Sequence, residues 1–309
     1  MSAEAWLGAD DAPAAPVDPG VLSEQAVLVT VGACTDAGQR RAENQDDFLV
    51  ADLTVPPGEG GLLIQADDVG ADPGSARCTL GSRGLLALVA DGMGGAAGGR
   101  IASQLAVVWT YRELVRRLAQ EPLAPERCAE ALRAAVAAAG SRVHEQGKLH
   151  PQYSGMGSTM TAVVLLGPSC FIAQVGDSRA YLVRGGRPHR LTRDQSLVQQ
   201  LVDAGALTPE QAAHSAHGSL LLQALGTAPE LQVDLTWQPG MRGDTLVLCS
   251  DGLYRLVSDE EIAAASAGIP DPALLCRTLV ALANERGGPD NVTVVAARLD
   301  GAGLPAADG

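Results

Sequence analysis

The sequence predicts an α+β domain with a large sheet at its core. Many short apolar runs rich in Val and Leu are bounded by Gly, Pro or Asp, which is typical of strands. Segments with apolar residues at helical spacing gather in two clusters. No internal repeat or linker divides the chain. Together these three observations favour one domain of packed sheets and helices.

The length and composition are compatible with this organisation. The chain has 309 residues, enough for one large domain or two small ones. Apolar residues make up 46% of it and aromatic residues only 3%, so Val, Leu and Ala must fill the core. We assign residues 26–300 to a single domain, preceded by a disordered tail at 1–25, rich in Ala, Pro and Asp, and followed by a flexible end at 301–309.

The charge argues against two classes of partner. The formal net charge is −14 and the isoelectric point is near 4.7, so neither nucleic acid nor an anionic membrane surface is an expected partner. No apolar run is long enough to span a membrane, and residues 1–20 lack the pattern of a signal peptide. The six cysteines form no CxxC pair and the five histidines show no zinc spacing. We therefore expect a cytoplasmic protein with reduced thiols. We also expect a monomer.

The sequence of the first part of the domain predicts three strands and a loop. A run rich in β-branched residues predicts a strand over 26–35, and a polar segment at 36–47 precedes a second strand that begins at Phe48. Residues 62–64 are expected to pair with this second strand across a Pro-Pro-Gly turn. Residues 67–84 are rich in Gly, Asp and Ser and have little periodicity, so they predict a long surface loop.

The rest of the chain contains the helices and the remaining strands. Ser258 and Glu261 form a capping box that opens one helix. A segment at 195–213 is also expected to be helical and broken near Gly205. Apolar spacing or capping predicts further helices at 99–119, 125–146 and 272–285. Short apolar runs predict strands at 85–90, 160–166, 170–175, 245–249 and 292–299.

Five aspartates lie at the ends of expected strands. Three of them follow an apolar strand and precede Gly or Ser, and two precede a strand: Asp91, Asp177 and Asp251, then Asp46 and Asp290. One interpretation is ordinary turn chemistry, since Asp-Gly is common in turns. The other is that the carboxylates converge on one edge of the sheet core, where their repulsion would require cations. Oxygen ligands without His or Cys select Mg²⁺ or Mn²⁺, and two such ions can activate a water for attack on phosphorus.

An arginine and a series of short motifs accompany these aspartates. An Arg near the cluster, as Arg41 would be, can hold phosphate oxygens by paired hydrogen bonds. The motifs are Arg41-Ala42-Glu43-Asn44-Gln45-Asp46, Asp91-Gly92-Met93-Gly94-Gly95, Gly155-Met156-Gly157-Ser158-Thr159, Gly176-Asp177-Ser178-Arg179, Ser250-Asp251-Gly252 and Gly288-Pro289-Asp290-Asn291. In this order they resemble the metal-dependent PPM family of Ser/Thr protein phosphatases, the protein phosphatase 2C type, in its bacterial form. The resemblance extends from about residue 28 to residue 299.

The resemblance implies a fold and a metal site. The fold would be a central antiparallel β-sandwich with helices on both outer faces, in four layers, and the metals would lie at one end of the sandwich. Asp91 would bridge two Mn²⁺ or Mg²⁺ ions. Asp251 and Asp290 would complete the shell of the first ion, and the Gly92 carbonyl would serve the second.

The resemblance also implies catalytic roles and an activity. Asp46 would orient metal-bound water, and Arg41 would grip the substrate phosphate. Asp177, with Asp251, would offer a third, weaker metal site. The implied activity is hydrolysis of phosphoserine and phosphothreonine on proteins by direct attack of the metal-bridging water, with a bacterial Ser/Thr kinase as the natural counterpart.

Three features depart from the pattern that the resemblance implies. Met93 stands where eukaryotic members often carry a His proposed as general acid, and Gly218 stands where many bacterial members have an Arg before the residue matching Ser219. The segment at 51–84 is longer than the hairpin turn common in bacterial members. It is acidic, which is compatible with either a tolerated surface insertion or an element that docks substrates with basic flanks.

Two other functions are compatible with the sequence. The first is a catalytically weak member of the same fold that binds phosphoproteins as a signalling module. The second is a metal-dependent phosphohydrolase of small molecules. The aspartates distinguish the first alternative, because pseudoenzymes typically lose one of them, whereas all are present here.

Overall fold

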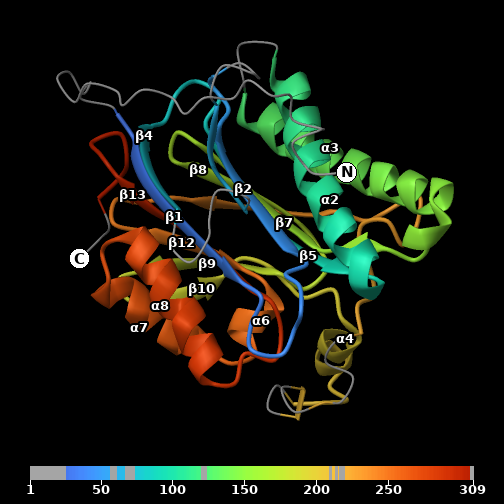
Figure 1. The fold of residues 1–309 in the computed structure, drawn as a ribbon. Helices are drawn as coiled ribbons and strands as arrows, with labels where there is room; N and C mark the ends of the chain where they lie inside the picture. Colours follow the sequence, from blue (N-terminus) through green and yellow to red (C-terminus); the bar gives the residue numbers. More distant parts are fainter. Residues whose placement is uncertain are drawn as a thin grey trace.

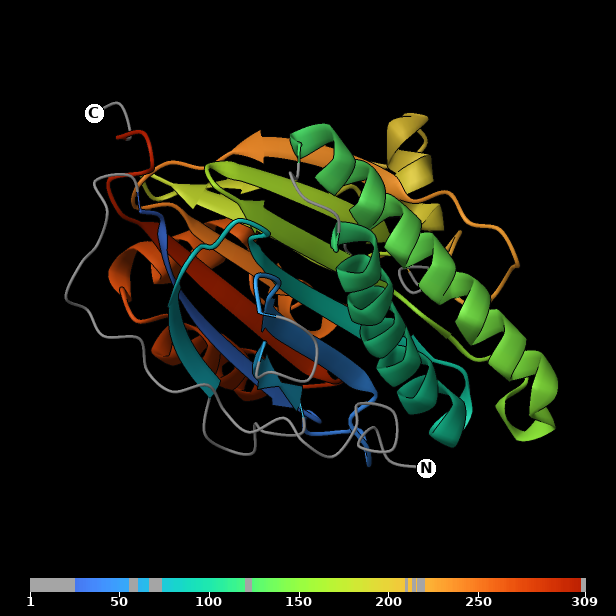
Figure 2. The same ribbon diagram turned by 90° about the horizontal axis from the view of Figure 1, so that it is seen from above.

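The computed structural model describes residues 26–55, 61–66, 74–119, 124–208, 211–212, 215 and 220–306. Two antiparallel sheets face each other, and a pair of long helices covers the outer face of each one (Figures 1 and 2). The helices α7 (Asp259–Gly268) and α8 (Pro272–Glu285) lie on one side, and α2 (Gly95–Leu118) and α3 (Pro125–Leu149) lie on the other. This four-layer β-sandwich confirms the expected α+β fold class.

The first sheet joins strands from both ends of the described chain. Its order is β10-β9-β12-β13-β1-β4. The central pair places Leu28 opposite Asp300 and Asp36 opposite Val292, so the first and last strands of the domain are neighbours. The strands are β1 (Leu28–Asp36), β4 (Gly74–Thr79), β9 (Arg179–Arg184), β10 (Arg187–Arg190), β12 (Thr245–Cys249) and β13 (Val292–Asp300).

The second sheet has the order β11-β8-β7-β5-β2-β3, and the short β6 pairs with the end of β5. Two of its neighbouring pairs, β2-β3 and β7-β8, are hairpins of consecutive strands, and the other pairs join strands that lie far apart in the sequence. The strands are β2 (Asp46–Asp52), β3 (Leu62–Gln65), β5 (Leu85–Met93), β6 (Gly157–Ser158), β7 (Met160–Leu166), β8 (Ser169–Val175) and β11 (Asp234–Pro239). The expected pairing of residues 62–64 with the second strand is confirmed, as Ile64 lies opposite Val50.

Alternating apolar residues make three separate cores. On β12, Leu246 and Leu248 point into the space between the sheets, while Val247 and Cys249 point towards α7 and α8. The same alternation on β5 sends Leu88 to the layer under α2 and α3. Central strands are covered on both faces, so their residues are almost all apolar. These continuous apolar runs allow the strands to be predicted from the sequence.

The helix boundaries follow from local chemistry. Ser258 accepts a hydrogen bond from the Glu261 amide and Glu261 reciprocates, so the expected capping box of α7 is confirmed. Asp271 caps α8 through the amides of the first turn, next to Pro272. Two short helices, α4 (Leu197–Asp203) and α6 (Asp251–Tyr254), and a 3₁₀ turn, η2 (Pro151–Tyr153), complete the described helices.

The structure corrects the expectation for residues 67–84. Residues 74–79 form β4, which pairs with β1 from Leu28↔Thr79 to Ala33↔Gly74 at the edge of the first sheet. Half-buried and exposed residues alternate along β4, and the half-buried Ala76 and Cys78 pack at the border of the core between the sheets. An edge strand with polar residues at alternate positions resembles a polar loop in sequence. Only the pairing with a partner strand distinguishes the two.

Other expectations were incomplete. The helix expected over 195–213, broken near Gly205, is confirmed for Leu197–Asp203, and residues 211–212 are helical again. The edge strands β10 and β11 were not predicted. The tail at 1–25, Gly218 and Ser219 lie outside the described residues, as do 56–60 and 67–73 of the segment at 51–84. Within the described part of the chain, none of the helices has the length and apolarity needed to cross a bilayer.

Candidate functional site

The strands bring the predicted aspartates to one end of the sandwich. Asp46 opens β2 and lies directly opposite Asp91 on β5. The sequence predicted that the β5 strand ends before Asp91. It continues to Met93, because Gly92 and Met93 pair with β6. Asp91 is therefore held within the strand by Thr159: its amide donates to Thr159 Oγ1 at 2.9 Å, and its carbonyl accepts from the Thr159 amide at 2.8 Å.

Gly92 is required by the close approach of two other segments. A Cβ atom at this position would collide with the carbonyl oxygens of Gly99 and Gln45. The Gly92 amide donates to the Gln45 carbonyl at 3.1 Å, which ties the end of β5 to the residue before Asp46. The absence of a side chain therefore lets the backbone of Gly92 lie against the loop that leads into β2.

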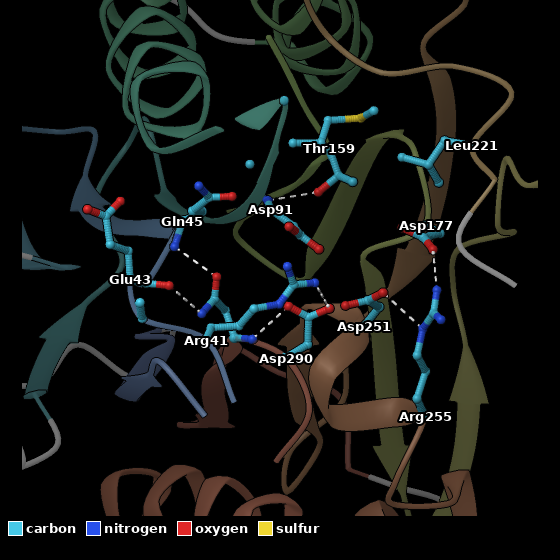
Figure 3. A pocket seen from close by; sticks show the side chains of 15 residues that line it. Arg41, Glu43, Gln45, Asp91, Thr159, Asp177, Leu221, Asp251, Arg255 and Asp290 are labelled. Atoms are coloured by element: carbon cyan, nitrogen blue, oxygen red, sulfur yellow. Dashed lines mark hydrogen bonds and ion pairs between the residues drawn. The ribbon is translucent and has the colours of Figure 1, made fainter. Parts of the chain in front are cut away.

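The remaining aspartates reach the same place from three other elements. Asp177 follows β8, Asp251 is the first residue of α6 after β12, and Asp290 precedes β13. Together with Asp91 and Arg41 they line a cleft of about 540 Å³ (Figure 3). In antiparallel sheets the beginnings of some strands and the ends of others meet at one edge, which explains how residues spread over the chain converge.

Asp46 lies beneath the cleft rather than in its lining. It is buried, and its Oδ2 accepts hydrogen bonds from Ser250 Oγ at 2.6 Å and Thr293 Oγ1 at 2.8 Å. Its Oδ1 is buried and has no hydrogen-bond partner among the described residues. The two donors come from the end of β12 and from β13, so Asp46 links the two sheets at the floor of the site.

Arg41 lies at the rim of the cleft. Its Nη2 donates to Asp290 Oδ2 at 2.8 Å, and 54% of its side chain remains exposed. Asn291 fixes the loop that carries Arg41: its Oδ1 accepts from the Gln45 amide, and its Nδ2 donates to the carbonyls of Ala37 and Glu43. The motif Gly288-Pro289-Asp290-Asn291 did not predict this role of Asn291.

Burial and mutual repulsion dominate the electrostatics. Burial raises the pKa of Asp46 to about 7, against the opposing hydrogen bonds of Ser250 and Thr293. Burial, followed by the charges of Asp46 and Asp251, raises the pKa of Asp91 well above its ordinary value. Without cations the site therefore favours protonated carboxyl groups, and bound cations would favour the charged forms.

The pKa values of Asp177 and Asp251 are also raised, mainly by burial. Burial raises the pKa of Asp177 to about 7, and the charge of Asp251 adds to this. Burial also raises the pKa of Asp251, while the nearby Arg255 opposes the shift. Arg41 has a raised pKa because of its hydrogen bond to Asp290.

The donor set fits hard divalent cations. Asp46 has a buried carboxylate oxygen without a hydrogen-bond partner among the described residues, and several carboxyl groups of the site have raised pKa values. Both observations indicate a site that bound cations would stabilise. Among the described residues, no three His, Cys, Asp or Glu side chains already surround one point as ligands of an ion. Asp290 and Asp251 instead contact Arg41 and Arg255. An ion here would complete its shell with water and main-chain oxygens, as Mg²⁺ usually does.

Sequence reasoning missed the residues that support Asp177 and Asp251. Tyr254 Oη donates to Asp177 Oδ2 at 3.0 Å, and Arg255 forms ion pairs with both aspartates. The spacing of Asp251 and Arg255, four residues apart, is the signal that could have indicated their contact.

Comparisons with known proteins identify the family of the chain. The family model for protein phosphatase 2C matches residues 64–285. The chain is 43% identical over 213 residues to the serine/threonine protein phosphatase PstP of Mycobacterium tuberculosis, covering 69% of this chain and 40% of that protein. It is 32% identical over 261 residues to a putative protein phosphatase 2C-type protein of Streptococcus pyogenes, covering 84% of this chain and 93% of that protein.

A solved structure extends the comparison from the sequence to the fold. The catalytic domain of the phosphatase PstP in complex with two manganese ions superposes with a TM-score of 0.68 at 35% identity, covering 89% of this chain and 99% of that one. The chain spans only 40% of the length of the M. tuberculosis relatives that it matches. Since the family model covers most of the sequence and the sandwich matches in space, the chain belongs to the protein phosphatase 2C family.

Proposed function

We propose that this protein is a metal-dependent phosphatase that hydrolyses phosphoserine and phosphothreonine on proteins. The single observation that carries the proposal is the convergence of Arg41 with four aspartates on one cleft, above the buried Asp46. The arginine can bind phosphate oxygens, and the carboxylate oxygens around it can bind hard cations. Family membership supports the same reaction, and residues 26–300 would form its single catalytic domain.

The metal site would be held by Asp91 and by the residues around it. Asp91 would bridge two ions, Asp251 and Asp290 would complete one shell, and the Gly92 carbonyl would serve the other ion. Bound divalent ions supply charge stabilisation to the phosphoryl group and lower the pKa of water. The two manganese ions of the PstP structure support a two-ion site. We propose Mn²⁺ or Mg²⁺, since the donors are oxygen atoms.

The chain's own residues would bind the substrate and position the water. Arg41 would donate hydrogen bonds to the phosphate oxygens in place of the one that it now donates to Asp290, because its guanidinium is at the rim and half exposed. Asp46 would orient the attacking water from below, and its hydrogen bonds to Ser250 and Thr293 would hold its carboxylate in place. Met93 lines the cleft and offers no proton, so protonation of the leaving group would fall to water.

We further propose that the protein acts as a cytoplasmic monomer opposite a Ser/Thr kinase. The six cysteines are all free thiols, and five of them are buried, which supports a reducing compartment. An open cleft lined by an arginine and several aspartates suits a phosphorylated side chain on a protein surface rather than an enclosed small molecule.

The test is hydrolysis of a phosphoserine peptide with Mn²⁺, Mg²⁺ or EDTA. We expect turnover with either ion, none in EDTA, and a loss of about 100-fold or more in kcat/KM for Asp91→Asn. Asp300→Asn, at the opposite end of β13, is the matched control and should retain activity. Full turnover in EDTA would overturn the metal-dependent mechanism. Tight binding of the phosphopeptide without turnover would favour the signalling-module alternative.

A further inference from the structure

Arg255 lies between two of the aspartates that line the cleft. Its Nε donates to Asp251 Oδ2 at 2.9 Å, and its Nη2 is 3.6 Å from Asp177 Oδ2 (Figure 3). Asp177 and Asp251 are both largely buried. The guanidinium is therefore the cation that these two carboxylates share.

The position of Arg255 is determined by its short helix. Asp251 begins α6 and Arg255 is its C-cap, four residues later, so both side chains lie on one face of the same turn. The helix can pack closely on the β13 loop because Gly252 has no side chain; a Cβ there would collide with the Asn291 carbonyl. The arginine is thus presented to the two aspartates by a tightly packed backbone.

A second set of contacts holds Asp177 towards Arg255. Tyr254 Oη donates to Asp177 Oδ2, and the Arg179 guanidinium stacks on the Tyr254 ring at 3.6 Å from its centroid. Arg179 is itself fixed by two hydrogen bonds to Asp194, of 3.0 and 2.7 Å. These contacts keep the Asp177 carboxylate beside the guanidinium instead of leaving it free to turn.

A metal ion at this pair would compete with Arg255. It would need both aspartates at about 2.0–2.6 Å from its centre. The Oδ2 atoms of both are already engaged by the guanidinium, and two like charges a few ångströms apart repel each other strongly at a partly buried site. The pair therefore does not fit the third metal site that the sequence resemblance implied at Asp177 and Asp251.

We infer that Arg255 is a built-in cation that takes the place of a third ion, so that this chain binds two metal ions and not three. The inference rests on the two-ion site of the proposed function. Arg255 is then a positioning residue: it neutralises Asp177 and orients Asp251, which leaves the remaining oxygens of Asp251 for the metals at Asp91.

The experiment counts Mn²⁺ ions bound per chain by equilibrium dialysis and elemental analysis. We expect two ions for the wild type and for Arg255→Lys, which keeps a cation. We expect three for Arg255→Met and Arg255→Gln, with the third binding more weakly. Adding Asp177→Asn should return Arg255→Met to two ions and leave the wild-type count unchanged. Arg116→Met, which removes an exposed arginine paired with Glu113 on α2, is the control and should bind two.

The outcomes separate this inference from the proposed function. Three ions on the wild type, or two ions on both Arg255→Met and Arg255→Gln, would overturn the role of Arg255 while leaving a two-ion phosphatase intact. A wild type that binds no Mn²⁺ would overturn both. Two neutral replacements of Arg255 that differ in polarity keep the test valid if one of the variants does not fold. Circular dichroism of each variant checks that it is folded.

Discussion

Asp46 and Asp91 lie directly opposite each other on β2 and β5, two strands joined by antiparallel hydrogen bonds. Like charges in this relation destabilise a sheet. The sheet nevertheless places them together, with Asp46 buried and Asp91 partly so. A position that weakens the fold in the absence of cations is the expected mark of a functional site.

The first prediction concerns the stability of the metal-free protein. The pKa of Asp46 is about 7 in the folded state and about 4 in an unfolded chain. The folded state thus binds the proton more tightly, and stability should fall as the pH rises from about 4 to 7 and level off above. We expect the melting temperature in EDTA to be lower at pH 7.5 than at pH 5.5.

Saturating Mn²⁺ should remove this decrease, because the ions favour the charged carboxylates. Asp91→Asn, which removes one of the repelling charges, should make the decrease smaller in EDTA. A melting temperature in EDTA that does not change over this range would contradict the electrostatic account of the site.

The second prediction concerns Asp91 as a ligand. Loss of groups that merely support metal ligands typically costs about 10–100-fold in affinity or activity. Asp91→Asn removes a charge proposed to serve both ions, so kcat/KM should fall by about 100-fold or more, with weaker Mn²⁺ binding by calorimetry. Wild-type turnover would show that Asp91 is only a strand residue.

The third prediction concerns Arg41. A hydrogen bond to a charged group is worth about 1.5–3 kcal/mol, so Arg41→Ala should lower kcat/KM by roughly one to two orders of magnitude. The loss should appear mainly as a higher KM, because the residue binds phosphate. Arg40→Ala, one residue away and exposed, is the control. An unchanged kcat/KM would assign Arg41 to its ion pair with Asp290 alone.

The fourth prediction concerns the floor of the site. Thr293→Val removes one of the two hydrogen bonds that lower the pKa of Asp46. Its pKa should rise, and the acid limb of the kcat profile should move to higher pH. Thr110→Val is the matched control, because Thr110 is buried on α2 and its hydroxyl has no hydrogen-bond partner among the described residues. An acid limb that stays in place would exclude Asp46 as the group titrating there.

The fifth prediction concerns stability away from the cleft. Arg184 donates two hydrogen bonds, of 2.9 and 2.6 Å, to Asp244, which is 1% exposed. Arg184→Met leaves this carboxylate buried without its cation, at a cost of about 3–5 kcal/mol in urea unfolding. Arg116→Met, at an exposed pair, should leave the unfolding free energy nearly unchanged. Equal effects of the two changes would contradict the importance of burial.

The sequence by itself determined the elements that are buried on both faces. The apolar runs at 85–90 and 245–249 and the amphipathic segment at 272–285 are strands and a helix as expected. Their patterns are local consequences of burial, so they can be read without knowing their partners. The aspartates could be found in the same way, because each one stands at the end of such a run.

Only the tertiary structure decided which of these segments meet. The loop-like residues 74–79 are a strand because β1 pairs with them, and Arg41 contacts Asp290 across 249 residues of sequence separation. Whether Asp46 faces the cleft or lies beneath it, and whether Arg255 reaches Asp177, depends on how the two sheets and α6 pack. Long-range hydrogen bonds and packing set these relations, and a local pattern of residues carries no information about a partner so far away along the chain.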